Sequence, residues 1–206
     1  MRLHRSLVVG TAVAVAVLGL SGTAQAGDDG GGHHGNRAEV VEVRDDCDPA
    51  TFNAQTPPIP CVGDGDTTFD EFLAEFLKTG EVDGWDFHPD RVHVDEGQKV
   101  KAVNVGGEFH TFTRVKAFGD ACVPDLNLGK EPVIAECRDE AVAGALFQLT
   151  GLEPGGKLVV TSAHSGPAGY DQALQPGKNR FECLIHPWMR TVVVVEDDDH
   201  GHRGHH

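Results

Sequence analysis

The residues best equipped for chemistry lie in one short segment near the C-terminal end of the sequence. Cys183, His186 and Met189 occur there at intervals of three residues, with Pro187 and Trp188 between the last two. A thiolate, an imidazole and a thioether together select copper over magnesium, calcium or manganese. A short loop between two strands could bend all three side chains toward one ion. The spacing therefore predicts a metal site in this loop.

A further imidazole would have to come from elsewhere in the chain. His110 follows the turn at Gly106-Gly107 and stands at the start of a predicted strand. Two histidines and one cysteine in a plane, with a weakly bound axial methionine, form the blue-copper arrangement.

Each of these residues also has a simpler interpretation. Cys183 could be a buried free thiol or a disulfide partner, and Met189 could fill a gap in the core. Met189 is, however, the only methionine apart from Met1. The ordered spacing, together with a histidine carried by an upstream strand, favours the copper site.

The motif resembles the ligand loop of the cupredoxins, in particular plastocyanin and amicyanin, in which Cys-x-x-His-Pro-aromatic-Met recurs. The Gly-Gly turn and the following His-Thr-Phe-Thr segment are similar to the part of those proteins that carries the first histidine. The resemblance extends over residues 85–196. It implies a Greek-key β-sandwich or barrel with one type 1 copper ion, bound by His110, Cys183 and His186 in the plane and by Met189 along the axis.

The resemblance also implies a function. A cupredoxin carries single electrons between protein redox partners, and His186 would reach the surface within an apolar docking patch formed by Pro187 and Trp188. The rival interpretation is copper storage or delivery without electron transfer. An enzyme is not expected, because copper oxidases need additional His-x-His pairs and the only one here is His200-Gly201-His202.

Hydrophobic patterns in the rest of the chain predict an all-β domain with a short helical extension. Phe69, Phe72, Leu73, Phe76 and Leu77 recur with helical periodicity, which predicts a helix over residues 68–79. Short β-branched segments separated by Gly and Pro turns follow, as in sandwiches and barrels. The predicted strands are 91–94, 99–105, 109–115, 146–152, 157–162, 179–184 and 190–196; residues 117–145 form an insertion with a short helix near 140–145.

The termini have different compositions. Residues 1–26 have a basic start, an apolar stretch and Ala24-Gln25-Ala26, which together predict a cleaved signal peptide and a secreted or periplasmic protein. A retained membrane anchor is the less favoured alternative, and no stable membrane insertion is expected after cleavage. Residues 27–44 read as a linker, 45–84 as an N-terminal extension, 85–196 as the cupredoxin domain and 197–206 as an acidic tail whose histidines could bind metal weakly.

Four cysteines form two pairs that are close in sequence, Cys47 with Cys61 and Cys122 with Cys137. An oxidising compartment would allow both disulfides, although four cysteines permit three pairings. Cys183 is then left as the unpaired residue.

The net charge of −15, from 32 acidic and 17 basic residues, argues against nucleic acid as a partner because phosphates would be repelled.

Overall fold

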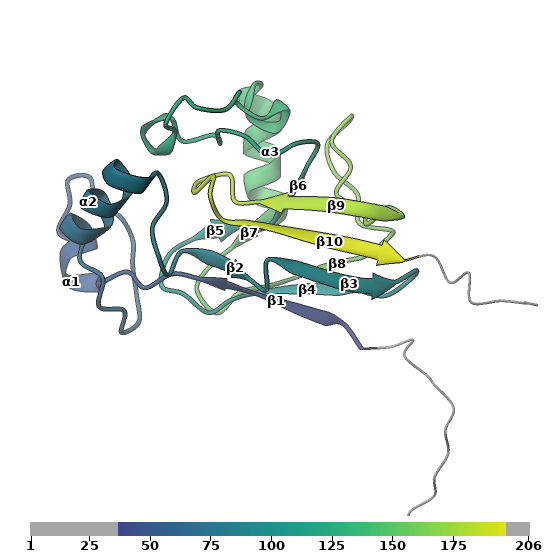
Figure 1. Cartoon of the computed structure of the whole chain (residues 1–206), viewed down its shortest axis with the longest axis horizontal. Coiled ribbons are helices and arrows are strands. Elements are labelled where there is room, and N and C mark those ends of the chain that lie inside the picture. The colour runs from purple at the N-terminus through teal and green to yellow at the C-terminus, as the bar shows by residue number, and fades with distance from the viewer. Residues whose placement is uncertain (1–36, 197–206) are drawn as a thin grey trace, which may run out of the picture. The chain divides into compact units, whose positions relative to one another are not determined.

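The computed structural model describes residues 37–196, which are built around two four-stranded sheets (Figure 1). The first sheet has the order β2 (Asp86–His88), β1 (Glu39–Arg44), β4 (Val100–Asn104) and β8 (Lys157–Val160). The second has the order β3 (Arg91–Asp95), β10 (Arg190–Glu196), β9 (Gly177–Glu182) and β6 (Thr113–Val115). A small ribbon pairs β5 (His110–Thr111) with β7 (Gly151–Leu152). The expected signal peptide and acidic tail lie outside the described residues.

Both large sheets mix parallel and antiparallel pairs. β1 runs parallel to β4 and β3 runs parallel to β10, whereas the other pairs are antiparallel. Valines from both sheets, such as Val41 and Val193, are fully buried in one continuous hydrophobic core. The predicted strand-rich class is confirmed. The described strands form separate sheets and not a closed barrel, and the Greek-key connection stays a prediction.

Strand β1 corrects the proposed domain boundary. Residues 39–44 were expected to belong to a linker, but they form a central strand of the first sheet. Val41 and Val43 alternate with more exposed residues, and both are fully buried. The prediction assigned this short alternating segment to the linker because the residues before it are rich in Gly and Asp. The sandwich therefore begins at β1 and includes chain on both sides of the N-terminal helices.

The two N-terminal helices lie near the end of the sheets where the β9–β10 loop turns (Figure 1). The short α1 (Pro49–Phe52) is capped by Asp48. The helix α2 (Phe69–Thr79) matches the prediction closely: Thr68 and Glu71 form a reciprocal capping box, and Gly80 ends the helix at φ 88°. Phe72 and Phe76 are buried, while Leu77 is 69% exposed.

The segment 146–152 was predicted as a strand, and this is wrong for most of its length. Helix α3 (Glu140–Thr150) continues through it, and only Gly151–Leu152 form a strand. Asp139 caps the helix by accepting hydrogen bonds from Ala141 and Val142, and Leu146 and Thr150 are buried on one face. The helix starts inside the insertion, which also contains the 3-10 turns η1 (Pro124–Leu126) and η2 (Ala135–Cys137).

Both expected disulfides are formed. Cys47 is bonded to Cys61 in the N-terminal extension, and Cys122 is bonded to Cys137 in the insertion. Loops of about 15 residues closed in this way contribute about 3 kcal/mol each in the chain-entropy model. Among residues 37–196, no helix has the length and hydrophobicity needed to cross a bilayer.

Candidate metal centre

Three of the predicted ligands converge at one end of the sandwich. The Sγ atom of Cys183 lies 3.9 Å from Nδ1 of His110 and 4.0 Å from Nδ1 of His186. The donor atoms of these three residues all lie within 4.8 Å of one another. His110 comes from β5, whereas the other two lie in the loop that joins β9 to β10. The fold therefore brings together side chains separated by more than 70 residues.

The loop that carries Cys183 is closed by its own backbone. Cys183 N donates to the carbonyl of Met189 at 3.1 Å, and Met189 N donates to the carbonyl of His186 at 3.0 Å. Met189 and Cys183 are both fully buried, and Cys183 is the one free cysteine among the described residues. The backbone of the loop thus turns Met189 back toward Cys183, and both residues belong to the same hydrophobic core; the role of Met189 as a ligand stays a prediction.

The hydrogen bonds around the thiol favour its ionised form. Burial alone would raise the pKa of Cys183, but its contacts with His110 and His186 hold that pKa well below the usual value. Beside it, the hydroxyl of Thr111 accepts a hydrogen bond from Leu184 N at 2.8 Å, which fixes the backbone next to the sulfur. A thiolate beside two imidazole nitrogens is a donor set that fits copper.

The other ring nitrogen of His110 is held by a carboxylate. Nε2 of His110 lies 2.8 Å from Oδ2 of Asp45, and both side chains are fully buried. Asp45 also accepts hydrogen bonds from the backbone of Gly107 and Glu108. Burial would lower the pKa of His110, but the bond to Asp45 and the contact with Cys183 raise it to about 9. The carboxylate therefore orients the ring and leaves Nδ1 directed at the sulfur, as in many metal sites.

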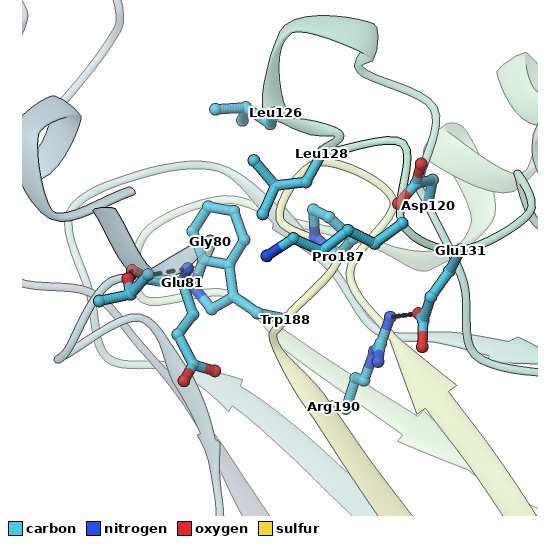
Figure 2. Close-up of a pocket in the computed structure, with 11 residues that line it drawn as sticks. Gly80, Glu81, Asp120, Leu126, Leu128, Glu131, Pro187, Trp188 and Arg190 are labelled. Atoms are coloured by element: carbon cyan, nitrogen blue, oxygen red, sulfur yellow. Dashed lines mark hydrogen bonds and ion pairs between the residues drawn. The ribbon is translucent and has the colours of Figure 1, made fainter. Parts of the chain in front are cut away.

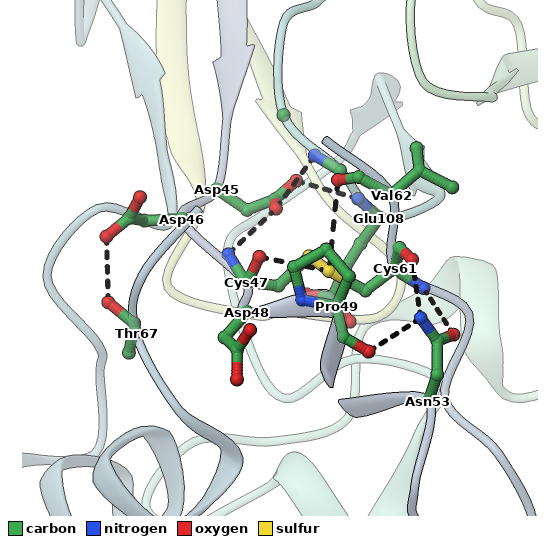
Figure 3. The surroundings of a disulfide bond; sticks show 12 residues. Asp45, Asp46, Cys47, Asp48, Pro49, Asn53, Cys61, Val62, Thr67 and Glu108 are labelled. Atoms are coloured by element: carbon green, nitrogen blue, oxygen red, sulfur yellow. Dashed lines mark hydrogen bonds between the residues drawn. A yellow bond between two sulfur atoms is a disulfide. The ribbon is translucent and has the colours of Figure 1, made fainter. Parts of the chain in front are cut away.

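The turn at Gly106-Gly107 is needed to seat Asp45. A Cβ atom on Gly106 would collide with the Asp45 carboxylate, and one on Gly107 would collide with the carbonyl of Val62. Val62 follows Cys61, so the disulfide loop and the glycine turn pack directly together, and Val62 N donates to the Gly107 carbonyl at 3.0 Å (Figure 3). Glycine is required here by close approach and not by a positive φ.

His186 also faces a carboxylate. Its Nε2 lies 4.0 Å from Oε2 of Glu108, which accepts a 2.6 Å hydrogen bond from the indole of Trp85. Burial raises the pKa of Glu108 despite the nearby His186 and the bond from Trp85. Asp45, Glu108 and His110 also place donor atoms within 4.8 Å of one another. Because Asp45 is already occupied by the backbone and by His110, we interpret these carboxylates as supports for the two histidines.

The residues of the expected docking patch are less exposed than the resemblance implies, and the patch itself stays a prediction. Pro187 is buried, His186 is only 3% exposed, and Trp188 is half-buried. The ring of Trp188 packs 5.4 Å from that of Phe76, and Phe72 packs 6.3 Å from His186, centroid to centroid. Figure 2 shows Trp188 beside Glu81, just after α2, and near Leu128 of the insertion. The two additions to the domain, the helix and the insertion, cover the face that the family resemblance leaves open.

Sequence reasoning missed Asp45 and Glu108. Glu108 lies two residues before a predicted ligand, and the general pairing of metal-binding histidines with carboxylates could have drawn attention to it. Asp45 lies 65 residues before His110, and its role depends on β1 entering the sheet. No local pattern in the sequence indicates that pairing.

Solved structures that are similar to this chain include cupredoxins and a copper enzyme. A purple cupredoxin from Nitrosopumilus maritimus is 11% identical, with a TM-score of 0.35, over 77% of this chain and 99% of that chain. A copper-containing nitrite reductase from Thermus scotoductus is 17% identical, with a TM-score of 0.30, over 53% of this chain and 20% of that chain. An amicyanin mutant is 14% identical, with a TM-score of 0.29, over 54% of this chain and 73% of that chain. No family model and no curated protein sequence matches.

Proposed function

We propose that this chain is an exported type 1 copper protein of the cupredoxin kind that carries single electrons between protein partners. His110, Cys183 and His186 would bind one copper ion, and Met189 would be the weaker fourth ligand. The observation that carries the proposal is the position of the Cys183 sulfur, which lies at nearly equal distances from two Nδ1 atoms. The other four cysteines are used in disulfides, so this thiol is free for a metal.

Bound copper would supply a change of one unit of charge between its two oxidation states. The chain's own residues hold the ligands so that little rearrangement is needed. Asp45 fixes the ring of His110, Thr111 fixes the backbone beside the sulfur, and the buried loop keeps water away from the thiolate. A preset ligand geometry acceptable to both oxidation states favours rapid electron transfer.

The route of the electron differs from the one that the family resemblance implies. Because His186 is covered, we propose that Trp188 is the outermost group on the route. Its ring lies 5.3 Å from that of His186, and it is half-buried at the edge of a depression (Figure 2). A basic partner protein fits the acidic charge of the chain.

The first experiment is a visible absorption and paramagnetic-resonance spectrum of the copper-loaded full chain. We expect an intense thiolate-to-copper band and a narrow copper hyperfine splitting, both lost in Cys183→Ser and strongly changed in His110→Ala. His93→Ala is the matched control, because His93 lies in the middle of β3, is more than half exposed and pairs with Glu196 of β10. A Cys183→Ser variant that keeps the band would rule out the proposed centre.

The burial of His186 favours a second candidate, a protein that stores or delivers copper. A ligand set without an exposed imidazole edge suits retention of the ion as well as electron transfer. Cyclic voltammetry separates the two candidates. A reversible one-electron wave with rapid self-exchange supports the carrier, whereas slow exchange together with transfer of copper to a chelator supports storage.

A further inference from the structure

A cavity lies between the N-terminal helices and the ligand loop. It has a volume of about 390 Å³, within the range of small-molecule sites, which is about 300–1,000 Å³. Aromatic side chains form much of its wall, notably Phe52, Phe72 and Phe76, which are all at least 95% buried. His186 lines the same cavity, which therefore extends to one of the proposed copper ligands.

One polar group in this apolar wall has unused hydrogen-bonding capacity. Glu108 lines the cavity and is only 6% exposed. Its Oε2 accepts from Trp85, whereas its Oε1 accepts no hydrogen bond from the residues that the structure describes and is not fully enclosed by them. This accessible oxygen can therefore accept a hydrogen bond from a ligand or from water. The cavity thus presents one hydrogen-bond acceptor within an aromatic shell.

The charges around the cavity restrict what it can bind. Its described lining contains two acidic residues, Glu108 and Asp125, and no lysine or arginine. An anion would be repelled by these carboxylates. A cation would be attracted by the carboxylates and by the faces of the phenylalanine rings, but it would also lose much of its hydration shell against the apolar wall, so the amine probe below tests this choice directly. The complementary ligand is uncharged and aromatic, and it carries one O–H or N–H donor.

We propose that this cavity is a binding site for a small, uncharged phenol-like molecule. The ring would pack among the phenylalanines of α1 and α2, and the hydroxyl would donate to Glu108 beside His186. The site belongs to the N-terminal extension and the ligand loop together, and its existence does not depend on copper.

The probe is 2-naphthol, titrated by calorimetry into the full chain before and after copper loading. Naphthalene tests the hydrogen-bond donor, 2-naphthoate tests exclusion of anions, and 2-naphthylmethylamine tests exclusion of cations. We expect 2-naphthol to bind at least about tenfold more tightly than each of the other three compounds. Copper loading should also make the visible band sensitive to 2-naphthol, because the cavity touches His186.

A pair of variants on α2 tests the location. Leu73 lines the cavity and is 39% exposed, so Leu73→Trp should fill the space without loss of folding. Leu77 lies one helical turn further, outside the cavity lining, and is 69% exposed, so Leu77→Trp is the control. We expect the first variant to weaken 2-naphthol binding about tenfold or more and the second to change it less than about twofold.

A third measurement keeps the test independent of the variants. Nuclear Overhauser effects should connect the naphthol protons to the rings of Phe72 and His186 in the unaltered chain. The proposal is overturned if 2-naphthol fails to bind at millimolar concentration, if a charged probe binds more tightly, or if the contacts map elsewhere. Because binding is measured first without metal, a failure of the copper proposal would not be mistaken for a failure of this one.

Discussion

At the scale of single residues, the candidate centre contains two carboxylates in addition to its proposed ligands. Asp45 accepts the Nε2 proton of His110, and Glu108 stands beside Nε2 of His186. Negative charge behind an imidazole raises its basicity and stabilises the more highly charged metal ion. The resemblance to cupredoxins predicted the ligands, whereas the three-dimensional structure identified these supports.

Replacing Asp45 by Asn should weaken the site without removing a ligand. The amide can still accept a hydrogen bond from His110, but it carries no charge. We expect binding of Cu(II) to fall about 10- to 100-fold and the reduction potential to rise. Chelator competition and voltammetry measure both effects. Asp46→Asn is the control, because Asp46 bonds to Thr67 and lies outside the centre; equal effects of the two variants would contradict the role of Asp45.

Glu182 should make the copper-free protein less stable as the pH rises. Burial raises its pKa to about 8, despite the Arg190 guanidinium 3.1 Å away, and its Oε1 has no hydrogen-bond partner among the described residues. Between about pH 4.5 and 8 the folded carboxyl therefore keeps a proton that the unfolded chain has lost. Because the folded state binds more protons, its stability decreases across this range.

Urea unfolding at several pH values tests this expectation. Glu182→Gln should give a flatter dependence than the unaltered chain. Glu131→Gln is the control, because Glu131 also pairs with Arg190 but is about half exposed. Parallel curves for Glu182→Gln and the unaltered chain would show that this carboxyl titrates normally.

At the scale of elements, helix α2 acts as the cover of the centre. Its position was predictable because its signals are local: the capping box at Thr68, the spacing of Phe72 and Phe76, and the stop at Gly80. Strand β1 and helix α3 were not predictable in the same way. β1 is stabilised by β2 and β4, which are distant in sequence, and the apolar segment after Ala145 fits a buried strand as well as a helix until Asp139 is recognised as its cap.

Removal of the α2 cap should loosen this cover. In Thr68→Ala the Oγ1 acceptor for Glu71 N is lost, which costs about 1 kcal/mol of helix stability. Amide hydrogen exchange should accelerate in the first turn of α2, and quenchers should reach Trp188 more easily. Lys78→Ala, an exposed change on the same helix, should leave both measurements unchanged. Unaltered exchange in Thr68→Ala would mean that packing alone holds the helix.

At the scale of the whole molecule, the candidate centre brings together residues from distant parts of the sequence, from Asp45 to Met189. Asp45 directly follows β1, His110 lies in β5, and Cys183 and Met189 lie in the loop between β9 and β10. An ion that binds the folded chain and not the unfolded chain should therefore stabilise all of these elements together.

Copper loading should raise the unfolding temperature measurably. At a free copper concentration one hundred times Kd, the gain is about 2.7 kcal/mol, or roughly 5–10 °C for a domain of this size. Differential scanning calorimetry of the loaded and metal-free protein measures the shift. Cys183→Ser should lose most of it, whereas His93→Ala should keep it. A full shift in Cys183→Ser would place the stabilising ion at another site.

The wide separation of Asp45 and Met189 in the sequence determines when during synthesis and export the site can bind an ion. The ribosome synthesises Asp45 long before Met189. If the chain is exported in the unfolded state, the two residues pass through the export channel in the same order. No complete pocket exists until the final loop has emerged and closed against the first strand. We therefore expect the ion to be acquired at the destination, from the copper available there, and not carried along from the site of synthesis.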